Sequence, residues 1–287
     1  MVDVRISEML TYSTVQIKCE YNNGACGSGT GFIINLCKNK EKGTCVPVLV
    51  TNNHVVENSK KTVLEFCLAN EKNEPIDTKT FTIELSDPNW VKHPDNTVDL
   101  RCLALAPLLN VIEKLNKKIF YVPINSEIIP NDKQLQEFSA LEDLVMVGYP
   151  IGLSDEYNHK PVLRKGTTAT HMKNDYQGKK EFLMDMACYP GSSGSPVFIY
   201  NDGTYTTPSG ELVMGNRIFF VGVLYGGPQY SASGIITFLN LPNIPKPIIN
   251  IPTNLGIAIK SERILEFEEL FNNKVNDNEQ AQDADGE

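Results

Sequence analysis

Ser193 lies in a turn whose composition could support nucleophilic chemistry. The turn reads G-S-S-G-S-P (residues 191–196) and precedes an apolar run at residues 197–200. The glycines that flank the serine allow a tight turn in which the hydroxyl is exposed and backbone N–H groups converge. An exposed hydroxyl can attack a carbonyl carbon, and converging N–H groups stabilise the oxyanion that forms. The same residues would also suit an ordinary turn without chemistry, so residues elsewhere in the chain must show whether this turn is catalytic.

Two residues earlier in the chain could activate this serine. His54 follows the apolar run at residues 47–51, and Asp99 opens the run at residues 99–105. A histidine at a strand end can act as a general base, although a single histidine is more often structural. The order His, Asp, Ser is one of three that unrelated Ser-His-Asp hydrolases use. Together the three residues favour acyl-transfer chemistry.

Some neighbouring residues offer alternatives to this set. Asp95 or Asp87 could replace Asp99, which we prefer because it opens an expected strand, whereas Asp95 lies in the loop H-P-D-N. Cys188 is expected to be a packed thiol rather than a nucleophile. The remaining histidines lie in polar segments and are expected to be exposed to solvent: His93, His159 and His171.

Short apolar or alternating runs, bounded by Gly, Asn, Pro and Asp, dominate the chain and predict strands. Many short strands separated by turn residues are typical of an antiparallel sandwich or barrel. The runs are residues 15–19, 30–35, 47–51, 62–67, 80–85, 99–105, 144–148, 162–168, 181–186, 195–200, 218–225 and 256–260.

Four segments depart from the strand pattern. Residues 106–140 are polar and mixed, which predicts a linker between two halves. Residues 227–253 contain five prolines and predict an extended loop. Residues 261–271 begin with a capping serine and have apolar side chains at helical spacing, which predicts a helix packed on the sheet. The acidic residues 274–287 predict a solvated tail.

The composition limits the kinds of partner and cofactor. A net charge of −9 in 287 residues argues against nucleic acid and anionic membranes, which require an excess of Lys and Arg. The apolar runs have strand length, well below the ~20 residues of a membrane-spanning helix. The first residues show no signal-peptide pattern, so we expect a cytoplasmic protein with reduced cysteines. Seven cysteines without a C-x-x-C pair provide no metal framework, and we expect no metal or organic cofactor.

Four motifs follow one another along the chain. They are G-S-G-T-G-F-I-I (residues 27–34), T-N-N-H-V-V (51–56), D-L (99–100) and G-S-S-G-S-P (191–196). In this order they resemble the motifs of trypsin-like (chymotrypsin-fold) serine peptidases, in particular the disulfide-free type common in bacteria. Flanking motifs at residues 147–150, 161–166 and 256–259 extend the resemblance.

The resemblance implies an all-β fold of two antiparallel six-stranded β-barrels with a C-terminal helix. Residues 1–125 would form the first barrel and carry the His and the Asp. Residues 126–273 would form the second barrel, carry the Ser and end in the helix, and residues 274–287 would be an acidic disordered tail. The site would then lie in the cleft between the barrels.

The resemblance also implies a role for each site residue. Ser193 would be the nucleophile and His54 the general base, with Asp99 orienting the imidazole. The backbone N–H groups of Gly191 and Ser193 would form the oxyanion hole. The primary substrate pocket would have no carboxylate to pair with Arg or Lys, because its floor and facing wall would be formed by Ala187, Tyr225, Gly226 and Gly227.

The implied activity is that of a serine endopeptidase acting on peptides or proteins. One alternative is a catalytically weak pseudopeptidase that binds extended peptides at a strand edge, although the intact His54 and Ser193 argue against it. A small-ester hydrolase would share the triad but usually has G-x-S-x-G. Arg101 stands where the family usually has a small residue. Ser192 stands where secreted relatives have an Asp, so we expect the oxyanion hole to be held by turn geometry or set by a regulatory protein partner.

Overall fold

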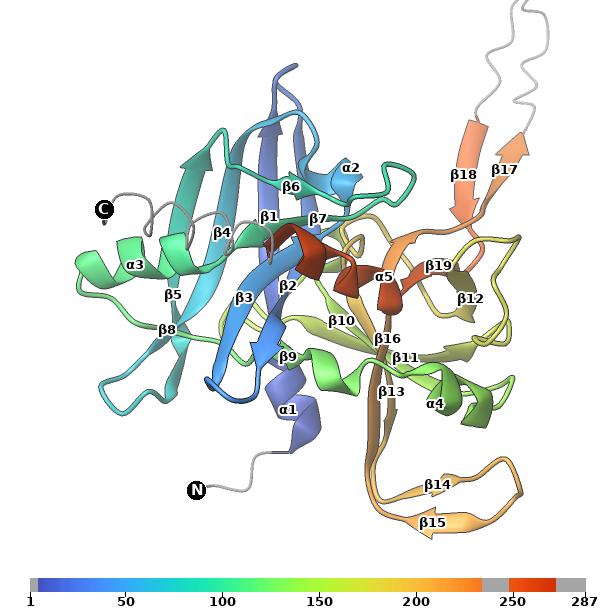
Figure 1. Ribbon diagram of the computed structural model, residues 1–287. Helices are drawn as coiled ribbons and strands as arrows, with labels where there is room; N and C mark the ends of the chain where they lie inside the picture. The colour runs from blue at the N-terminus through green and yellow to red at the C-terminus, as the bar shows by residue number, and fades with distance from the viewer. Residues whose placement is uncertain (1–4, 234–247, 272–287) are drawn as a thin grey trace, which may run out of the picture.

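Antiparallel strands form two halves of the chain, of which the computed structural model describes residues 5–233 and 248–271 (Figure 1). The first half is one nine-stranded sheet with the order β5-β4-β1-β2-β3-β7-β6, in which β8 pairs with β4 and β9 with β2. Its six longer strands are β1 (Thr14–Tyr21), β2 (Cys26–Asn39), β3 (Thr44–Thr51), β4 (Ser59–Ala69), β5 (Pro75–Ser86) and β7 (Arg101–Ala104). Its two-residue strands are β6 (Val91–Lys92), β8 (Ile119–Phe120) and β9 (Ile124–Asn125).

The second half is a closed barrel with the strand order β10-β11-β12-β19-β16-β13. Its strands are β10 (Asp143–Gly148), β11 (Val162–Thr168), β12 (Glu181–Asp185), β13 (Pro196–Asn201), β16 (Arg217–Gly226) and β19 (Leu255–Lys260). Every run predicted as a strand overlaps one, so the all-β prediction is confirmed. The first half differs from a simple six-stranded barrel, because short strands extend its sheet and its ladder does not close within the described residues.

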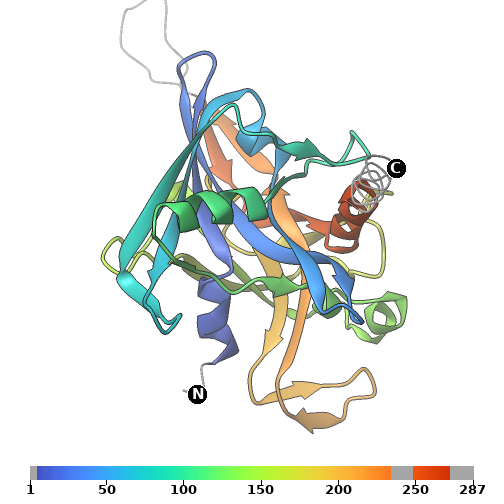
Figure 2. The ribbon, with the colours of Figure 1, turned by 60° about the vertical axis from the view of Figure 1, so that its left-hand side comes forward.

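Two predictions for the connecting segments are wrong in part. Residues 106–140 are not a plain linker, because they contain β8, β9, α3 (Ala106–Lys114), the short turn η1 (Ser126–Ile128) and α4 (Asp132–Glu137). The apolar face of α3 packs on the first sheet, across which the helix lies in Figure 2. The proline-rich segment includes the hairpin of β17 (Gln229–Ser233) and β18 (Ile248–Pro252), whose edges tolerate proline.

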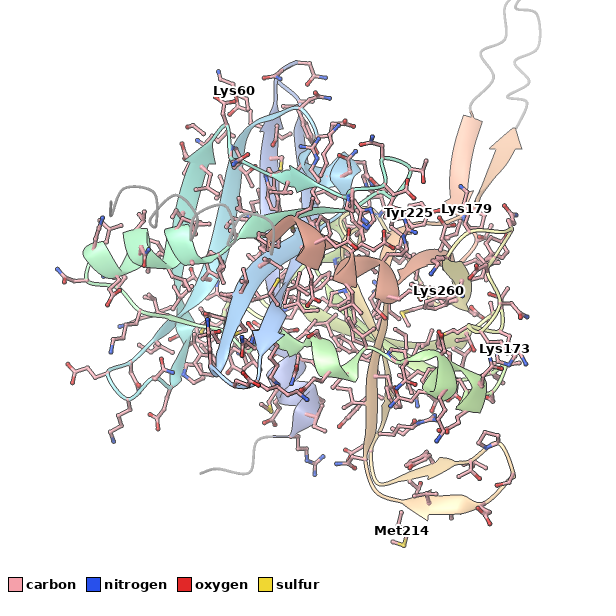
Figure 3. All side chains as sticks on the ribbon, in the orientation of Figure 1. Lys60, Lys173, Lys179, Met214, Tyr225 and Lys260 are labelled. Carbon is pink, nitrogen blue, oxygen red and sulfur yellow. The ribbon has the colours of Figure 1, made fainter. Side chains whose placement is uncertain are left out.

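The C-terminal helix is present, while the predicted acidic tail lies outside the described residues. Helix α5 (Glu262–Leu265) is followed by a further helical stretch at residues 267–271, and the apolar face buries Ile264, Phe267 and Phe271. Further elements that were not predicted are α1 (Ile6–Thr11) and the strands β14 (Thr204–Thr206) and β15 (Leu212–Met214). These two strands form a hairpin that projects from the barrel, with Met214 pointing outward (Figure 3).

A continuous apolar core joins the two halves. One cluster of buried side chains combines Phe32 from β2 with Phe198 from β13 and Phe220 from β16, and Phe267 packs against it from the C-terminal segment. The rings of Phe32 and Phe220 meet edge to face with their centroids 5.2 Å apart. Two further clusters lie within the separate halves. Any sliding of one half on the other would expose aromatic surface, so the core fixes their relative position.

This shared core predicts cooperative unfolding. Truncating Phe220 to Ala should lower the free energy of unfolding by about 3–5 kcal/mol, because it removes a fully buried ring that both halves contact. Urea denaturation followed by fluorescence would measure this loss in a single transition. The matched change Leu212→Ala, on the exposed hairpin, should cost less than about 0.5 kcal/mol. Two separate transitions in the wild type would contradict the shared core.

Candidate active site

The pairing of β3 with β7 brings His54 and Asp99 together. Strand β3 ends at Thr51, which lies opposite Arg101 in the antiparallel register, and the helical turn α2 (Asn53–Val56) then carries His54. Continuing the register beyond both strands places Asp99 opposite Asn53, whose N–H donates to the Asp99 carbonyl at 3.1 Å. Strand pairing therefore determines which acid reaches the histidine.

Asp99 holds His54 through two hydrogen bonds. Its Oδ2 accepts from the ring Nδ1 at 2.5 Å, and its Oδ1 accepts from the backbone N–H of His54 at 2.9 Å. Since Nδ1 is bonded, Nε2 is left as the basic nitrogen of a half-exposed ring. Asp95 instead accepts hydrogen bonds from Thr97 and Arg263, so it is not the partner of His54.

Arg101 braces the helical turn that carries His54. Its Nε donates to Oδ1 of Asn53 at 2.6 Å, and its guanidinium lies 3.8 Å from the carboxylate of Glu57. These residues flank α2 on both sides of the histidine. The arginine that departs from the family pattern therefore has a structural role, because it ties α2 to the strand that follows Asp99.

Hydrogen bonds hold the two backbone carbonyls that share peptide groups with the Gly191 and Ser193 N–H groups. The Pro190 carbonyl accepts from the Ile151 N–H at 2.5 Å, and the Ser192 carbonyl accepts from the Ser195 N–H at 3.0 Å. In a trans peptide the N–H points opposite to the C=O. Each bond therefore fixes the plane of one peptide group, and with it the direction of the Gly191 N–H or of the Ser193 N–H.

Strand β2 connects the serine turn with the histidine turn. The Thr30 N–H donates to the Ser193 carbonyl at 2.8 Å, while the adjacent Gly29 packs so closely on α2 that a Cβ there would lie 2.5 Å from Val55 Cγ1. Gly194 has a φ of +86°, and a Cβ on it would collide with the Thr30 carbonyl. No hydrogen bond between the Ser193 hydroxyl and the His54 ring is present in the described part of the chain, and such bonds commonly tighten only with substrate.

An uncharged cavity opens beside Ser193. Tyr225, Gly226 and Gly227 form one side, as predicted from the resemblance, and Tyr225 donates its hydroxyl to Glu181 at 2.9 Å. Burial and this bond to a carboxylate raise the pKa of Tyr225, which therefore remains protonated. The other lining residues are Cys188, Tyr189, Pro190, Leu224, Pro228 and Leu255.

Cys188, and not Ala187, forms the inner wall of this cavity. Ala187 is not among the lining residues, and its carbonyl accepts a hydrogen bond from Arg164 Nη1 at 3.2 Å. Burial raises the pKa of the Cys188 thiol to about 11, so the thiol is protonated at neutral pH and is a poor nucleophile. The prediction of the floor was displaced by one residue, because the sequence does not show which way the side chains turn after β12.

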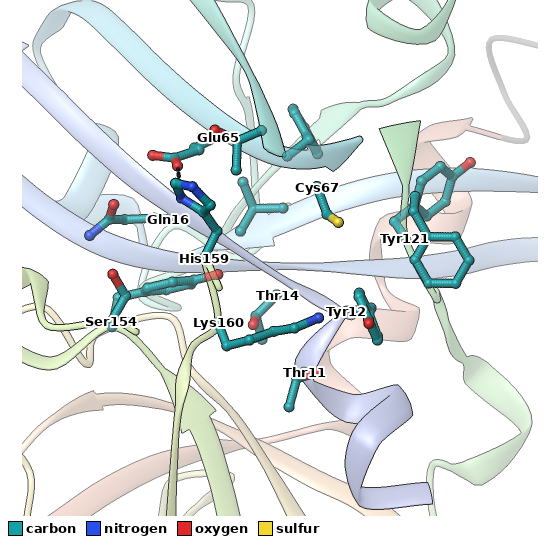
Figure 4. Close-up of a pocket in the computed structure, with 15 residues that line it drawn as sticks. Thr11, Tyr12, Thr14, Gln16, Glu65, Cys67, Tyr121, Ser154, His159 and Lys160 are labelled. Carbon is teal, nitrogen blue, oxygen red and sulfur yellow. Dashed lines mark ion pairs between the residues drawn. The ribbon is translucent and has the colours of Figure 1, made fainter. Parts of the chain in front are cut away.

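Two other histidines make contacts that the sequence did not indicate. The prediction that His93 is exposed is wrong: its side chain is completely buried, its Nδ1 accepts from the Asp95 N–H at 3.1 Å and its Nε2 donates to the Arg263 carbonyl at 2.8 Å. His159 pairs with Glu65 of β4 at 3.0 Å, and Figure 4 shows this pair beside Lys160. Arg263 and Glu65 lie far in sequence from the histidines that they contact, which explains why local polarity was misleading.

Within residues 5–233 and 248–271, no group of three or more His, Cys, Asp or Glu side chains is placed to hold a metal ion. The same part of the chain contains no helix long and apolar enough to span a membrane.

Comparison with known proteins gives one family match. A family model described as a trypsin-like peptidase domain matches residues 29–206. A search of curated proteins finds no significant match. Similar solved structures include the HtrA-type protease AlgW with tripeptide, at 13% identity and a TM-score of 0.49, covering 91% of this chain and 60% of that one. Another is the Rv3671c protease from M. tuberculosis in its active form, at 14% identity and a TM-score of 0.46, covering 92% and 82%. The chain thus spans 60% of the length of the AlgW chain.

The hydrogen-bonded pair of His54 and Asp99 predicts which acidic residue is required for the reactivity of Ser193. Asp99→Asn should slow the reaction of Ser193 with a fluorophosphonate by roughly 10³–10⁴-fold, because the amide cannot stabilise the imidazolium and favours the wrong tautomer. Asp95→Asn is the matched control and should stay within about threefold of the wild type. Labelling rates measured by mass spectrometry would decide, and the opposite ranking of the two variants would refute the assignment.

Proposed function

This chain belongs to the trypsin-like peptidase family, and on that premise we propose that it is a serine endopeptidase that cleaves peptide bonds in proteins through His54, Asp99 and Ser193. The observation that carries the proposal is the hydrogen-bonded His54–Asp99 pair, joined through β2 to the turn that carries Ser193. A binding module has no physical need for this combination.

Acylation begins when Ser193 Oγ attacks the carbonyl carbon of the scissile peptide. His54 Nε2 accepts the hydroxyl proton, and the electron pair of the C=O bond moves onto the oxygen, which the N–H groups of Gly191 and Ser193 stabilise. The imidazolium then gives its proton to the leaving amine as the C–N bond breaks. Asp99 remains ionised and stabilises the imidazolium through Nδ1–H.

Deacylation repeats these steps with water as the nucleophile. His54 removes a proton from water, the oxyanion forms again in the same hole, and the acyl-oxygen bond to Ser193 breaks as the proton returns to Oγ. We expect an extended substrate to lie along residues 225–227, which line the uncharged cavity beside Ser193. The chemistry uses only groups of this chain.

The nucleophile can be tested directly. A fluorophosphonate should label the wild type at Ser193, and Ser193→Ala should abolish labelling and lower peptide hydrolysis by roughly 10⁴–10⁶-fold. Ser195→Ala, which changes a buried serine in the same turn, should still be labelled. Labelling that persists in Ser193→Ala would refute the mechanism, and a folded wild type that binds peptides without labelling would favour the pseudopeptidase.

The cavity predicts the preferred residue on the acyl side of the cut. No carboxylate is among its lining residues, and the Glu181 carboxylate behind Tyr225 is already engaged by the Tyr225 hydroxyl, so a Lys or Arg side chain would be buried without a direct partner. We expect uncharged side chains to be preferred over Lys and Arg by roughly 10²-fold in kcat/KM. Sequencing the cleavage sites in a digested proteome measures this preference, and a majority of cuts after Arg or Lys would contradict it.

A further inference from the structure

Thr30 connects the first half with the two backbone segments that shape the oxyanion hole. It lies in β2, and it is completely buried. Its hydroxyl donates to the Gly191 carbonyl at 3.0 Å and accepts from the Tyr149 N–H at 3.0 Å. Both partners belong to the second half, so this one hydroxyl makes two of the polar contacts between the halves.

The hydroxyl is not needed for the strand itself. Neighbouring positions of β2 are filled by buried apolar residues, and a valine has the same shape as threonine at such a site. A buried hydroxyl stabilises only if it is hydrogen-bonded, because its removal from water is otherwise costly. Here both its donor and an acceptor lone pair are used, and both serve the backbone of the other half.

Each partner of the hydroxyl leads to the oxyanion hole. Gly191 supplies one of the two N–H groups of the hole, and Thr30 fixes the carbonyl of that same residue. Tyr149 begins the segment in which Ile151 donates its N–H to the Pro190 carbonyl, and that carbonyl shares a peptide group with the Gly191 N–H. The hydroxyl therefore acts on both sides of Gly191.

The conformation of Ile151 shows that the segment from Tyr149 to Ile151 is held by contacts with other parts of the chain. Ile151 has a φ of +52°, which is unfavourable for a β-branched residue, and its side chain is largely exposed. Local sequence preference would not maintain such a backbone, so the surrounding contacts must do so. The Tyr149 N–H bond to Thr30 and the Ile151 N–H bond to Pro190 are two such contacts.

We propose that Thr30 is a positioning residue for the oxyanion hole: its hydroxyl orients the Gly191 N–H, directly through the Gly191 carbonyl and indirectly through the segment from Tyr149 to Ile151. The inference rests on the proposed function, because an oriented N–H matters only if an oxyanion forms. By this route the half that carries His54 and Asp99 also sets the geometry of the hole in the half that carries Ser193.

The experiment compares isosteric variants. Thr30→Val removes the hydroxyl and should lower kcat for peptide hydrolysis by roughly 10–100-fold with KM within about threefold, since losing a direct oxyanion donor costs 10²–10³-fold. Thr30→Ser keeps the hydroxyl and should restore kcat to within about threefold of the wild type. Binding of a peptide aldehyde, whose hemiacetal places an oxygen in the hole, should weaken in parallel with kcat/KM.

Thr168→Val is the matched control. The Thr168 hydroxyl is also buried, donates to one carbonyl (Ala140) and accepts from one N–H (Glu142), but it lies in β11 away from the serine turn. This variant should lose similar stability and keep its kcat. An equal loss of kcat in Thr168→Val and Thr30→Val would show a general structural effect and overturn the proposal, as would full activity of Thr30→Val.

A second pair of variants tests the same route where Thr30→Val does not fold. Ile151→Pro removes the N–H that holds the Pro190 carbonyl and also forces residue 151 out of its positive φ, because the ring fixes φ near about −65°; it should lower kcat by roughly 10–100-fold. Ile151→Gly keeps this N–H, adopts the positive φ without strain and should retain kcat. Full activity of Ile151→Pro would overturn the proposal. A wild type that neither cleaves peptides nor reacts with a fluorophosphonate would refute the proposed function, and this inference with it.

Discussion

The close approach of β2 to the serine turn is the contact on which the rest of the site depends. The Thr30 N–H donates to the Ser193 carbonyl, and the Thr30 hydroxyl donates to the Gly191 carbonyl. Two glycines permit this approach, since a Cβ on Gly194 would collide with the Thr30 carbonyl and a Cβ on Gly148 would collide with the Ser195 hydroxyl. Phe32 of the same strand, β2, belongs to the aromatic core that spans both halves, and this core prevents the halves from separating.

In the proposed function, this contact would hold the Gly191 and Ser193 N–H groups in place before a substrate binds. A flexible hole would have to reorganise as charge develops, whereas preorganised N–H groups need no such change. The carbonyls of Pro190, Gly191 and Ser193 accept from donors elsewhere in the chain and that of Ser192 accepts from Ser195 within the turn, so the backbone of the turn is held in place. In this chain the residue before the nucleophile is an uncharged, buried serine, and hydrogen bonds to the backbone hold the turn where secreted relatives use an ion pair.

The position of His54 likewise depends on contacts with residues that are distant in sequence. Strand pairing of β3 with β7 brings Asp99 to His54, and Arg101 ties the short turn that carries the imidazole to the strand beyond the acid. His93 has the same ring chemistry in a different place. There the buried ring accepts from the Asp95 N–H and donates to the Arg263 carbonyl, which joins the loop before Asp99 to the C-terminal segment, so it contributes to structure.

The sequence by itself determined the strands and marked His54, Asp99 and Ser193 as the candidate residues for chemistry. Alternation along a strand, and glycines flanking a serine, leave a local pattern because they follow from the sterics of neighbouring residues. The pairing of His54 with Asp99, the lining of the cavity by Cys188, the burial of His93 and the bonds of Thr30 were decided only by the tertiary structure. In each case the partner is distant in sequence, and contact depends on strand register and on how the two halves pack.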